Sequence, residues 1–365
     1  MTRSVDLTRV RRIWLRAPNW LGDFVMATAA FARIRAAFPA AHITVGIRPY
    51  LRPLLDGSRL FDAIAETPRA KGVRGLWQQV AAMRAGRFDL AIVLPNSLAT
   101  GLVPFLAGVP LRLGYQQGRP LLMNLGRRAE RNRHWWQRRR GPSRKPEPMP
   151  HYYSALLDVI GLPPGGMHPV LDVTDGQDRW VAEHLRSLGI GDGERLLLLV
   201  VGANFGASKL WVPERFGAVA KVFAQKHGLR PLVLVGPAEV ELGERIAREG
   251  DCLVLSRPVL PLDKLKALVR RGALMVTGDT GPRHLAVAFD RPVVCLIGPT
   301  DANYTNYCLE HTELIRKDLD CVPCQRKVCP LGHHRCMRDI TVDEVVAAGE
   351  RLLARPAPAS GTPAR

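Results

Sequence analysis

The stretch Thr277-Gly278-Asp279-Thr280-Gly281-Pro282-Arg283-His284 follows an apolar run that predicts a buried strand and precedes one that predicts a helix. A similar stretch, Pro18-Asn19-Trp20-Leu21-Gly22-Asp23, stands near the start of the chain. Glycine in a strand-to-helix turn leaves backbone N–H groups at the positive end of a helix dipole, where a phosphate or another anion can bind. Two such turns, one in each half, predict two Rossmann-like halves that face each other across a cleft.

Apolar strands and amphipathic helices alternate along the chain, which is typical of an α/β protein. The 365 residues suit two domains, because single cores rarely grow past about 250–300 residues. We place an N-terminal Rossmann-like domain at 1–170, with a basic mobile loop at about 117–150, and a C-terminal Rossmann-like domain at 177–355. The Pro/Gly-rich stretch 161–176 predicts a linker, and the tail 356–365 is expected to be disordered. The expected strands cover 13–17, 42–47, 90–95, 196–201, 231–235, 252–255, 274–277 and 292–297, and the expected helices 24–38, 213–227, 240–248, 262–271 and 283–289.

The formal net charge is +19, which favours acidic partners such as nucleic acid, anionic lipid or a phosphorylated glycan. The N-terminus carries no evident secretory signal, and no run of about 18 uncharged apolar residues predicts a transmembrane helix. Seven cysteines, four of them clustered, fit a reducing compartment better than a disulfide scaffold. We therefore expect a soluble cytoplasmic protein that can sit on a membrane surface.

Asp23 stands at the expected start of the helix that follows the first turn. It could be an N-cap or first-turn residue that balances the helix dipole. It could also be a general base that takes a proton from an acceptor hydroxyl. Asn19 and Trp20 add weight to the second interpretation, because a large aromatic side chain in a tight loop is expected to pack or to bind.

Two loops in the second half have residues suited to a diphosphate. Gly202–Trp211 contains Asn204, Ser208 and Lys209, and the lysine would place a point charge on the diphosphate. The alternative is an ordinary loop whose lysine faces water. In the second loop, Asp279–His284, the Thr280 side chain and the Gly281 N–H could reach phosphate oxygens, with His284 on the same side. A histidine there could equally be structural.

The segment 321–336 has a spacing close to that of a zinc finger, Cys321-x2-Cys324-x4-Cys329-x6-Cys336. Four soft ligands within sixteen residues could hold a structural zinc ion or an iron–sulfur cluster. The alternative is a set of reduced thiols in a rigid loop. Four protein ligands leave no open position, so the segment is expected to have no catalytic role.

With these segments in view, the chain resembles glycosyltransferase family 9, the ADP-heptose:lipopolysaccharide heptosyltransferases, and is most similar to the heptosyltransferase II subgroup. The similarity runs from about residue 13 to about residue 353. Five segments carry it in the same order, which is more specific than any one alone: Pro18–Asp23, Val93–Ser97, Pro104–Pro110, Gly202–Lys209 and Asp279–His284.

The resemblance implies a GT-B fold, with the acceptor on the N-terminal domain and ADP-heptose on the C-terminal domain. It implies an inverting transfer of L-glycero-D-manno-heptose from ADP-heptose to a phosphorylated lipid A–Kdo–heptose acceptor, with no cofactor required for catalysis. Asp23 would be the general base, Leu260 would pack against adenine, and Glu239 or Glu241 would lie near the ribose. The donor residues implied are Asn204, Ser208, Lys209, Glu239, Leu260, Asp279, Thr280, Gly281 and His284. The acceptor residues implied are Asn19, Trp20, Arg48, Arg52 and Asn96.

The resemblance also implies a peripheral position at the inner face of the inner membrane. Arginine-rich stretches would then steer the enzyme to this anionic surface, through Arg48, Arg52, Arg69, Lys71 and the cluster Arg127–Arg140. Three other functions compete with this one. The first is a transferase of the same family that uses another nucleotide sugar or acceptor. The second is a basic nucleic-acid-binding protein, which the charge alone would suit, although no known reading module is present. The third is an inactive relative that acts as an interaction protein, against which Asp23 and Lys209 both count.

Overall fold

The computed structural model describes residues 6–70, 72–131 and 144–355. Lys71, the 132–143 part of the basic loop and the tail 356–365 lie outside the described residues, and so do the expectations stated for them. The chain divides into two compact units. The first unit comprises Met1–Arg133 and Glu147–Asp172, and the second comprises His134–Pro146 and Val173–Arg365.

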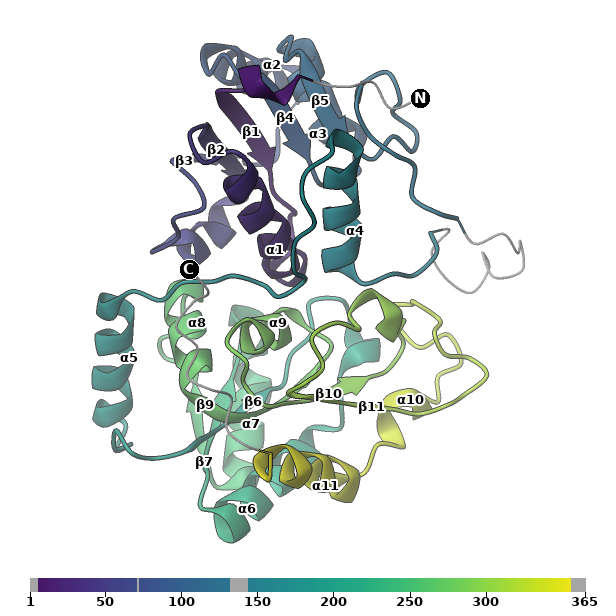
Figure 1. Ribbon diagram of the computed structural model, residues 1–365. Coiled ribbons are helices and arrows are strands. Elements are labelled where there is room, and N and C mark those ends of the chain that lie inside the picture. Colours follow the sequence, from purple (N-terminus) through teal and green to yellow (C-terminus); the bar gives the residue numbers. More distant parts are fainter. Residues whose placement is uncertain (1–5, 71, 132–143, 356–365) are drawn as a thin grey trace. The chain divides into compact units, whose positions relative to one another are not determined.

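The first unit is built on one parallel sheet (Figure 1). Its strands are β1 (Arg12–Arg16), β2 (His42–Ile47), β3 (Ala63–Glu66), β4 (Leu90–Val93) and β5 (Leu111–Gly114), and its helices are α1 (Leu21–Ala37), α2 (Gly72–Ala85), α3 (Leu98–Leu106) and α4 (Met149–Leu157). The five strands lie in the order β3-β2-β1-β4-β5, and every neighbouring pair is parallel. The strand order reverses between β1 and β4, which gives the doubly wound topology of a Rossmann-like domain.

The second unit repeats this plan with six strands. They are β6 (Leu196–Val200), β7 (Arg230–Leu234), β8 (Leu253–Leu255), β9 (Gly272–Gly278), β10 (Val293–Ile297) and β11 (Thr312–Arg316). Its helices are α5 (Asp175–Ser187), α6 (Pro213–His227), α7 (Val240–Gly250), α8 (Leu262–Arg271), α9 (Gly281–Ala288), α10 (Arg335–Arg338) and α11 (Val342–Leu353). The order β11-β10-β9-β6-β7-β8 is again all parallel, and it reverses between β9 and β6.

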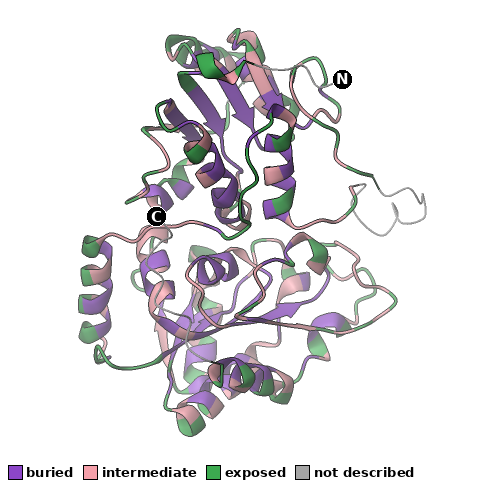
Figure 2. Ribbon diagram, viewed as in Figure 1, coloured by how far each residue is buried: buried purple, intermediate pink, exposed green. Residues whose placement is uncertain are grey.

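The central strands are buried on both faces, as their continuous apolar sequences predict (Figure 2). In β6 the five residues LLLLV are all buried, and helix α6 supplies Phe216, Val219 and Phe223 to the same core. In the first unit the Trp14 ring lies against Gly46, where a Cβ would come within 2.4 Å of its Cζ2 atom. A side chain at Gly46 would therefore displace the tryptophan and separate β1 from β2.

Helix α4 packs on α1 through one buried arginine. The Arg33 guanidinium donates from Nη1 to the Ser154 carbonyl at 2.8 Å and from Nη2 to Asp158 Oδ1 at 2.7 Å. Arg33 is only 7% exposed, so these partners fix the two helices relative to each other. The contact brings a helix that begins at residue 149 onto the helix that begins with the Asp23 turn.

The described part of 117–150 is more ordered than the mobile loop expected there. Arg119 is 2% exposed and donates to the carbonyls of Tyr115 and Ser97, and Met123 is fully buried. These two side chains fold 117–125 back onto the sheet, and α4 already begins at Met149. The expected linker 161–176 likewise ends in a helix, because Thr174 and Gln177 form a capping box that starts α5 at Asp175.

In the described residues, no helix combines the length and the apolar character needed to cross a membrane.

Candidate functional site

The predicted residues Asn19–Asp23, Asn96, Asn204–Lys209 and Asp279–His284 follow the strands at which each sheet reverses its order. In the second unit β6 pairs directly with β9, with Val200 opposite Thr277. The loop that follows β6 carries Lys209, and the loop that follows β9 carries Asp279. In open parallel sheets, ligands bind at the carboxyl ends of the strands at such a reversal. The topology therefore brings together two loops that are 70 residues apart in sequence.

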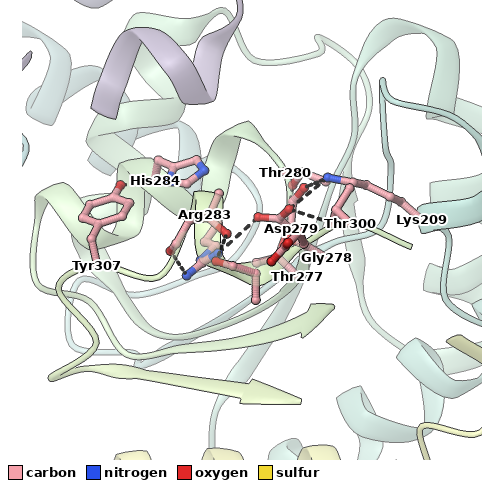
Figure 3. Close-up of polar contacts among 12 residues, drawn as sticks. Lys209, Thr277, Gly278, Asp279, Thr280, Arg283, His284, Thr300 and Tyr307 are labelled. Carbon is pink, nitrogen blue, oxygen red and sulfur yellow. Dashed lines mark hydrogen bonds and ion pairs between the residues drawn. The ribbon is translucent and has the colours of Figure 1, made fainter. Parts of the chain in front are cut away.

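Asp279 is the centre of a buried charge network at this edge (Figure 3). Lys209 Nζ lies 3.0 Å from Asp279 Oδ2, and the Thr300 hydroxyl donates to the same oxygen at 3.0 Å. Arg283 Nη1 lies 3.1 Å from Asp279 Oδ1, and its Nη2 donates to the Thr305 carbonyl at 2.9 Å. Two cations thus share one carboxylate, and the network keeps one positive charge in excess.

The electrostatics of Asp279 follow from these neighbours. Burial alone would raise the pKa of Asp279, but Lys209 and Arg283 hold the pKa well below its usual range. Asp279 therefore stays ionised, and the Lys209 ammonium stays fixed on it with 11% of its side chain exposed. The result is a lysine whose position is set before any ligand arrives.

His284 lies one turn into α9, and its partner is Tyr307. Its Nδ1 is 2.8 Å from the Tyr307 hydroxyl, and the two rings are stacked (Figure 3). Burial lowers the pKa of His284 to about 3, and the Arg283 cation acts in the same direction. The imidazole is therefore uncharged at neutral pH, so a contact with a diphosphate would be a hydrogen bond and not an ion pair.

The start of α9 also offers donors. Thr280 is the N-cap residue, but its side chain makes no capping hydrogen bond, and Gly281 opens the helix. The Thr280 hydroxyl lies 3.2 Å from that of Thr277. Positive charge from the helix N-terminus and from Lys209 thus lies at the same edge of the sheet.

The other predicted donor residues are placed unevenly. Ser208 is buried beside Lys209, whereas Asn204 is exposed in the same loop. The Glu239 carboxylate lies against Gly202 at the end of β6, where a Cβ would come within 1.8 Å of it, and Glu241 is exposed in the first turn of α7. Glu239 thus lies beside the end of β6, where its Oε2 accepts from the Gly236 N–H at 2.8 Å, whereas Glu241 lies on the helix surface. Leu260 is half-buried in the segment between β8 and α8.

In the first unit Asp23 is the third residue of α1, and Trp20 is the N-cap residue. Asp23 is therefore a first-turn residue and not the N-cap. The Tyr153 hydroxyl, from α4, donates to Asp23 Oδ1 at 3.2 Å. Burial and the nearby Asp23 carboxylate raise the pKa of Tyr50. Asp23 is half-buried, so a carboxylate with a fixed partner remains partly open to an acceptor.

Asn19, four residues before Asp23 in sequence, accepts hydrogen bonds from two guanidinium groups. Its Oδ1 accepts from Arg16 Nη2 at 2.6 Å and from Arg48 Nε at 3.1 Å, and its carbonyl accepts from the Tyr50 hydroxyl at 2.6 Å. Burial, together with the Arg48 cation, lowers the pKa of Arg16 to about 10, which leaves it charged at neutral pH. Trp20 next to it is 64% exposed.

The two remaining acceptor residues lie farther along the same unit. Arg52 is exposed, with Nε 3.9 Å from Glu66 Oε1. Asn96, after β4, donates from Nδ2 to the Tyr152 hydroxyl at 2.7 Å. The strand that precedes Asn96 is the one at which this sheet reverses, next to β1.

The four clustered cysteines surround one small cavity of about 20 Å³. Cys321, Cys324, Cys329 and Cys336 all line it, and burial together with the other three thiols raises the pKa of Cys336 to about 11. Within the described ranges, however, no group of three or more His, Cys, Asp or Glu side chains is placed to hold a metal ion. The expected zinc or iron–sulfur site is therefore not supported, because the spacing gathers the thiols around a cavity without arranging them as ligands of one ion.

Several residues of the two sites were not singled out from the sequence. Arg283 lies within the predicted segment Asp279–His284 but has no predicted role, and Thr300 and Tyr307 lie outside that segment. Tyr153 lies 130 residues from Asp23, so only the packing of α4 on α1 reveals the pair. A signal existed in the aromatic pair Tyr152-Tyr153 on a short apolar helix, directly after the basic stretch.

Comparison with known proteins agrees with this geometry. Residues 74–335 match the family model described as glycosyltransferase family 9 (heptosyltransferase). The chain belongs to glycosyltransferase family 9. It is 25% identical to lipopolysaccharide heptosyltransferase 2 of Escherichia coli K12, over 94% of this chain and 98% of that protein.

Solved structures of related glycosyltransferases also align with this chain. The structure of E. coli ADP-heptose lipopolysaccharide heptosyltransferase II aligns with a TM-score of 0.75 and 25% identity, over 94% of this chain and 98% of that chain. A family 9 glycosyltransferase from Veillonella parvula aligns with a TM-score of 0.79, 21% identity and coverage of 94% and 97%. The expected α/β GT-B fold, with two Rossmann-like domains, is confirmed.

Proposed function

We propose that this family 9 glycosyltransferase transfers L-glycero-D-manno-heptose from ADP-heptose to the inner core of lipopolysaccharide, in the manner of heptosyltransferase II. The observation that carries the proposal is the Lys209–Asp279–Arg283 network at the reversal point of the second sheet. It supplies a fixed cation beside a helix N-terminus, which is the chemistry that a nucleoside diphosphate needs. The match to a heptosyltransferase family supports heptose as the sugar that is transferred.

The donor side of the reaction is the departure of ADP. The negative charge that develops on the diphosphate would meet Lys209 Nζ and the first N–H groups of α9, with the ribose near Glu239 and adenine near Leu260. Asn204, Thr280 and Gly281 complete this set, and neutral His284 could add one hydrogen bond. Ser208 lies in the same loop, but its hydroxyl already donates to the Arg326 carbonyl. These groups stabilise the leaving group electrostatically, so we assign no step to a cofactor.

The acceptor side requires a base. Asp23 would take the proton from the acceptor hydroxyl as that oxygen attacks the anomeric carbon, which inverts the configuration there. Tyr153 holds one carboxylate oxygen at 3.2 Å and so orients the other. Arg16 and Arg48 lie around Asn19 beside it and suit a phosphorylated lipid A–Kdo–heptose acceptor, with Trp20, Arg52 and Asn96 as further contacts.

We also propose a peripheral position on an anionic membrane for the first unit. Helices α2 and α3 pack against each other and expose Val73, Trp77, Leu98 and Phe105. Exposed aromatic and aliphatic side chains on a protein with a net charge of +19 suit a negatively charged lipid surface. Sedimentation with vesicles that contain anionic lipid tests this: Trp77→Glu should reduce binding, and equal binding to neutral vesicles would contradict it.

The function is tested by ADP release on mixing the protein with ADP-heptose and a deep-rough core acceptor that carries one heptose. Release should require both substrates, and UDP- and GDP-sugars should give none. Release of UDP or GDP would instead support a transferase of the same fold with another donor. Tight, strongly salt-dependent binding of DNA or RNA without turnover of any nucleotide sugar would support the nucleic-acid alternative.

A further inference from the structure

The cysteine-rich segment 321–336 has no part in the proposed transfer, yet it contacts the loop that carries Lys209. We propose that this segment is a brace that fixes the Lys209 loop for donor binding, with His334 as its positioning residue. The inference rests on the proposed function, because it takes Lys209 to be the residue that meets the donor diphosphate. It gives the cysteine-rich segment a role that requires no metal.

The first contacts of the brace are made by Ser208, the residue before Lys209. Its backbone N–H donates to the Lys327 carbonyl at 3.0 Å, and its hydroxyl donates to the Arg326 carbonyl at 2.5 Å. Ser208 is only 2% exposed, so these bonds are shielded from water and hold the loop firmly. Ser208 thus has a structural task in addition to its predicted place in the donor loop.

His334 makes the third contact, from the far end of the segment. Its Nε2 lies 2.7 Å from the Ser208 carbonyl oxygen. A carbonyl can only accept, so Nε2 must carry the hydrogen. His334 is itself held in a left-handed conformation, with φ of 51°, and its backbone N–H donates to Cys329 Sγ at 3.4 Å. The Cys329 turn therefore determines where the imidazole lies.

Gly206 shows how closely the loop and the segment approach. Its φ is 149°, and a Cβ at this position would lie 2.5 Å from the Lys327 carbonyl oxygen. Any side chain here would push the loop away from the segment, in a conformation that already favours glycine. The loop therefore contacts the segment at Gly206 as well as at Ser208.

The loop position determines the lysine position. Lys209 Nζ donates to the Asp279 carbonyl at 2.5 Å as well as to its carboxylate, and its backbone N–H donates to the Gly206 carbonyl at 3.1 Å. Loss of the brace would let the loop shift, so a cation that is now fixed would have to be ordered when the donor binds. That cost falls on donor affinity and leaves the chemical step unaffected once the donor is bound.

The test compares His334→Ala with wild type for ADP affinity by calorimetry and for KM and kcat with ADP-heptose. Removal of the bond should weaken ADP binding and raise the donor KM by up to about tenfold, with kcat within about twofold. His334→Gln should restore both constants, because its amide N–H can donate to the Ser208 carbonyl. His227→Ala is the matched control: it removes a histidine 3.0 Å from Glu350, which lies on α11 and not on the donor loop.

Two further variants keep the inference falsifiable if His334→Ala unfolds. Gly206→Ala should raise the donor KM by disturbing the same contact from the other side. Cys329→Ala should raise the donor KM by a smaller factor. The double variant Cys329→Ala/His334→Ala should raise the donor KM by less than the product of the two single effects, because both changes act on one contact. A donor KM equal to that of His227→Ala in every one of these variants that folds would overturn the brace. Since wild-type ADP release is measured in the same assay, its absence would point to the proposed function and not to the brace.

Discussion

The turn after β1 and the loops after β6 and β9 occupy equivalent places in their sheets but differ in charge and burial. In the second unit, Asp279 is 8% exposed and is paired with two cations. In the first unit, Asp23 is half-buried and accepts a hydrogen bond from the neutral Tyr153, and Trp20 beside it is largely exposed. A carboxylate already committed to Lys209 and Arg283 can only organise charge, whereas a carboxylate held by a tyrosine can still accept a proton.

Replacing Asp23 should have the largest effect on turnover. Asp23→Ala or Asp23→Asn should lower turnover by about a hundredfold to ten-thousandfold, because a general base contributes on that scale. ADP affinity should remain close to that of wild type, since the donor network lies in the other unit. The measurement is kcat from ADP release, together with calorimetric titration of ADP.

Asp175→Asn is the matched control for Asp23, because it also removes a carboxylate from the first turn of a helix. If Asp23 only balances the helix dipole, both variants should lose about 0.3–1 kcal/mol of stability and keep their turnover. That result would remove Asp23 from the mechanism.

Replacing Lys209 should have the next largest effect, and it should lower ADP affinity as well as turnover, because this ammonium meets the diphosphate both when bound and when it departs. Lys209→Met should weaken ADP affinity by roughly tenfold to a hundredfold, the scale of a lost charged hydrogen bond. Lys221→Met, on the exposed face of α6, should leave the affinity unchanged. Equal ADP affinity in the two variants would show that the Lys209 ammonium serves only Asp279.

The sequence predicted the individual elements of this comparison better than their contacts. The helices 213–227 and 262–271 and the strand 42–47 agree with the structure at both ends. In the first of these, Pro213 starts the helix and Gly228, with positive φ, ends it, so local residues alone determine the bounds. The helix α4 is harder to predict, because Pro148 and Pro150 surround its first residue and its stability comes from packing on α1.

In the sites, too, the sequence predicted single residues better than the contacts between them. The motifs identified Asp23, Lys209 and Asp279, because glycine-containing turns after apolar strands are visible in the chain. The pairing of Lys209 with Asp279 depends on β6 lying next to β9, which no local pattern contains. The cysteine spacing led to a metal site that the described residues do not support, because spacing specifies how close thiols come in sequence but not where their sulfur atoms point.

Replacing His284 should have a smaller effect, which appears in the pH dependence of the free energy of unfolding. Its folded pKa is about 3 against an ordinary 6.5, so the unfolded chain binds a proton that the folded protein excludes. The resulting loss of stability begins as pH falls below about 6.5 and grows until about pH 3, reaching up to about 2 kcal/mol at pH 5. His284→Gln should lack this loss, so its free energy of unfolding should improve relative to wild type between pH 7.5 and pH 5. Parallel curves for the two proteins would contradict the buried neutral imidazole.

Tyr153→Phe should have the smallest effect and is the sharpest probe of the first unit. It removes one hydroxyl that donates to Asp23 Oδ1 but keeps the ring that packs in the core. The carboxylate would lose its orientation and remain able to accept a proton, so kcat should fall by roughly twofold to tenfold, with ADP affinity unchanged.

Tyr115→Phe is the control for this change, because Tyr115 is also buried and its hydroxyl donates to the Tyr152 carbonyl at 2.6 Å. Tyr115→Phe should lose at least as much stability as Tyr153→Phe, because the bond of Tyr115 is buried and that of Tyr153 to Asp23 is partly buried. Only Tyr153→Phe should lower kcat, because the Tyr153 hydroxyl donates to Asp23 Oδ1, whereas that of Tyr115 donates to the Tyr152 carbonyl. An equal fall in kcat for both would mean that the hydroxyl acts through packing of α4, and Asp23 would then owe its orientation to the helix turn alone.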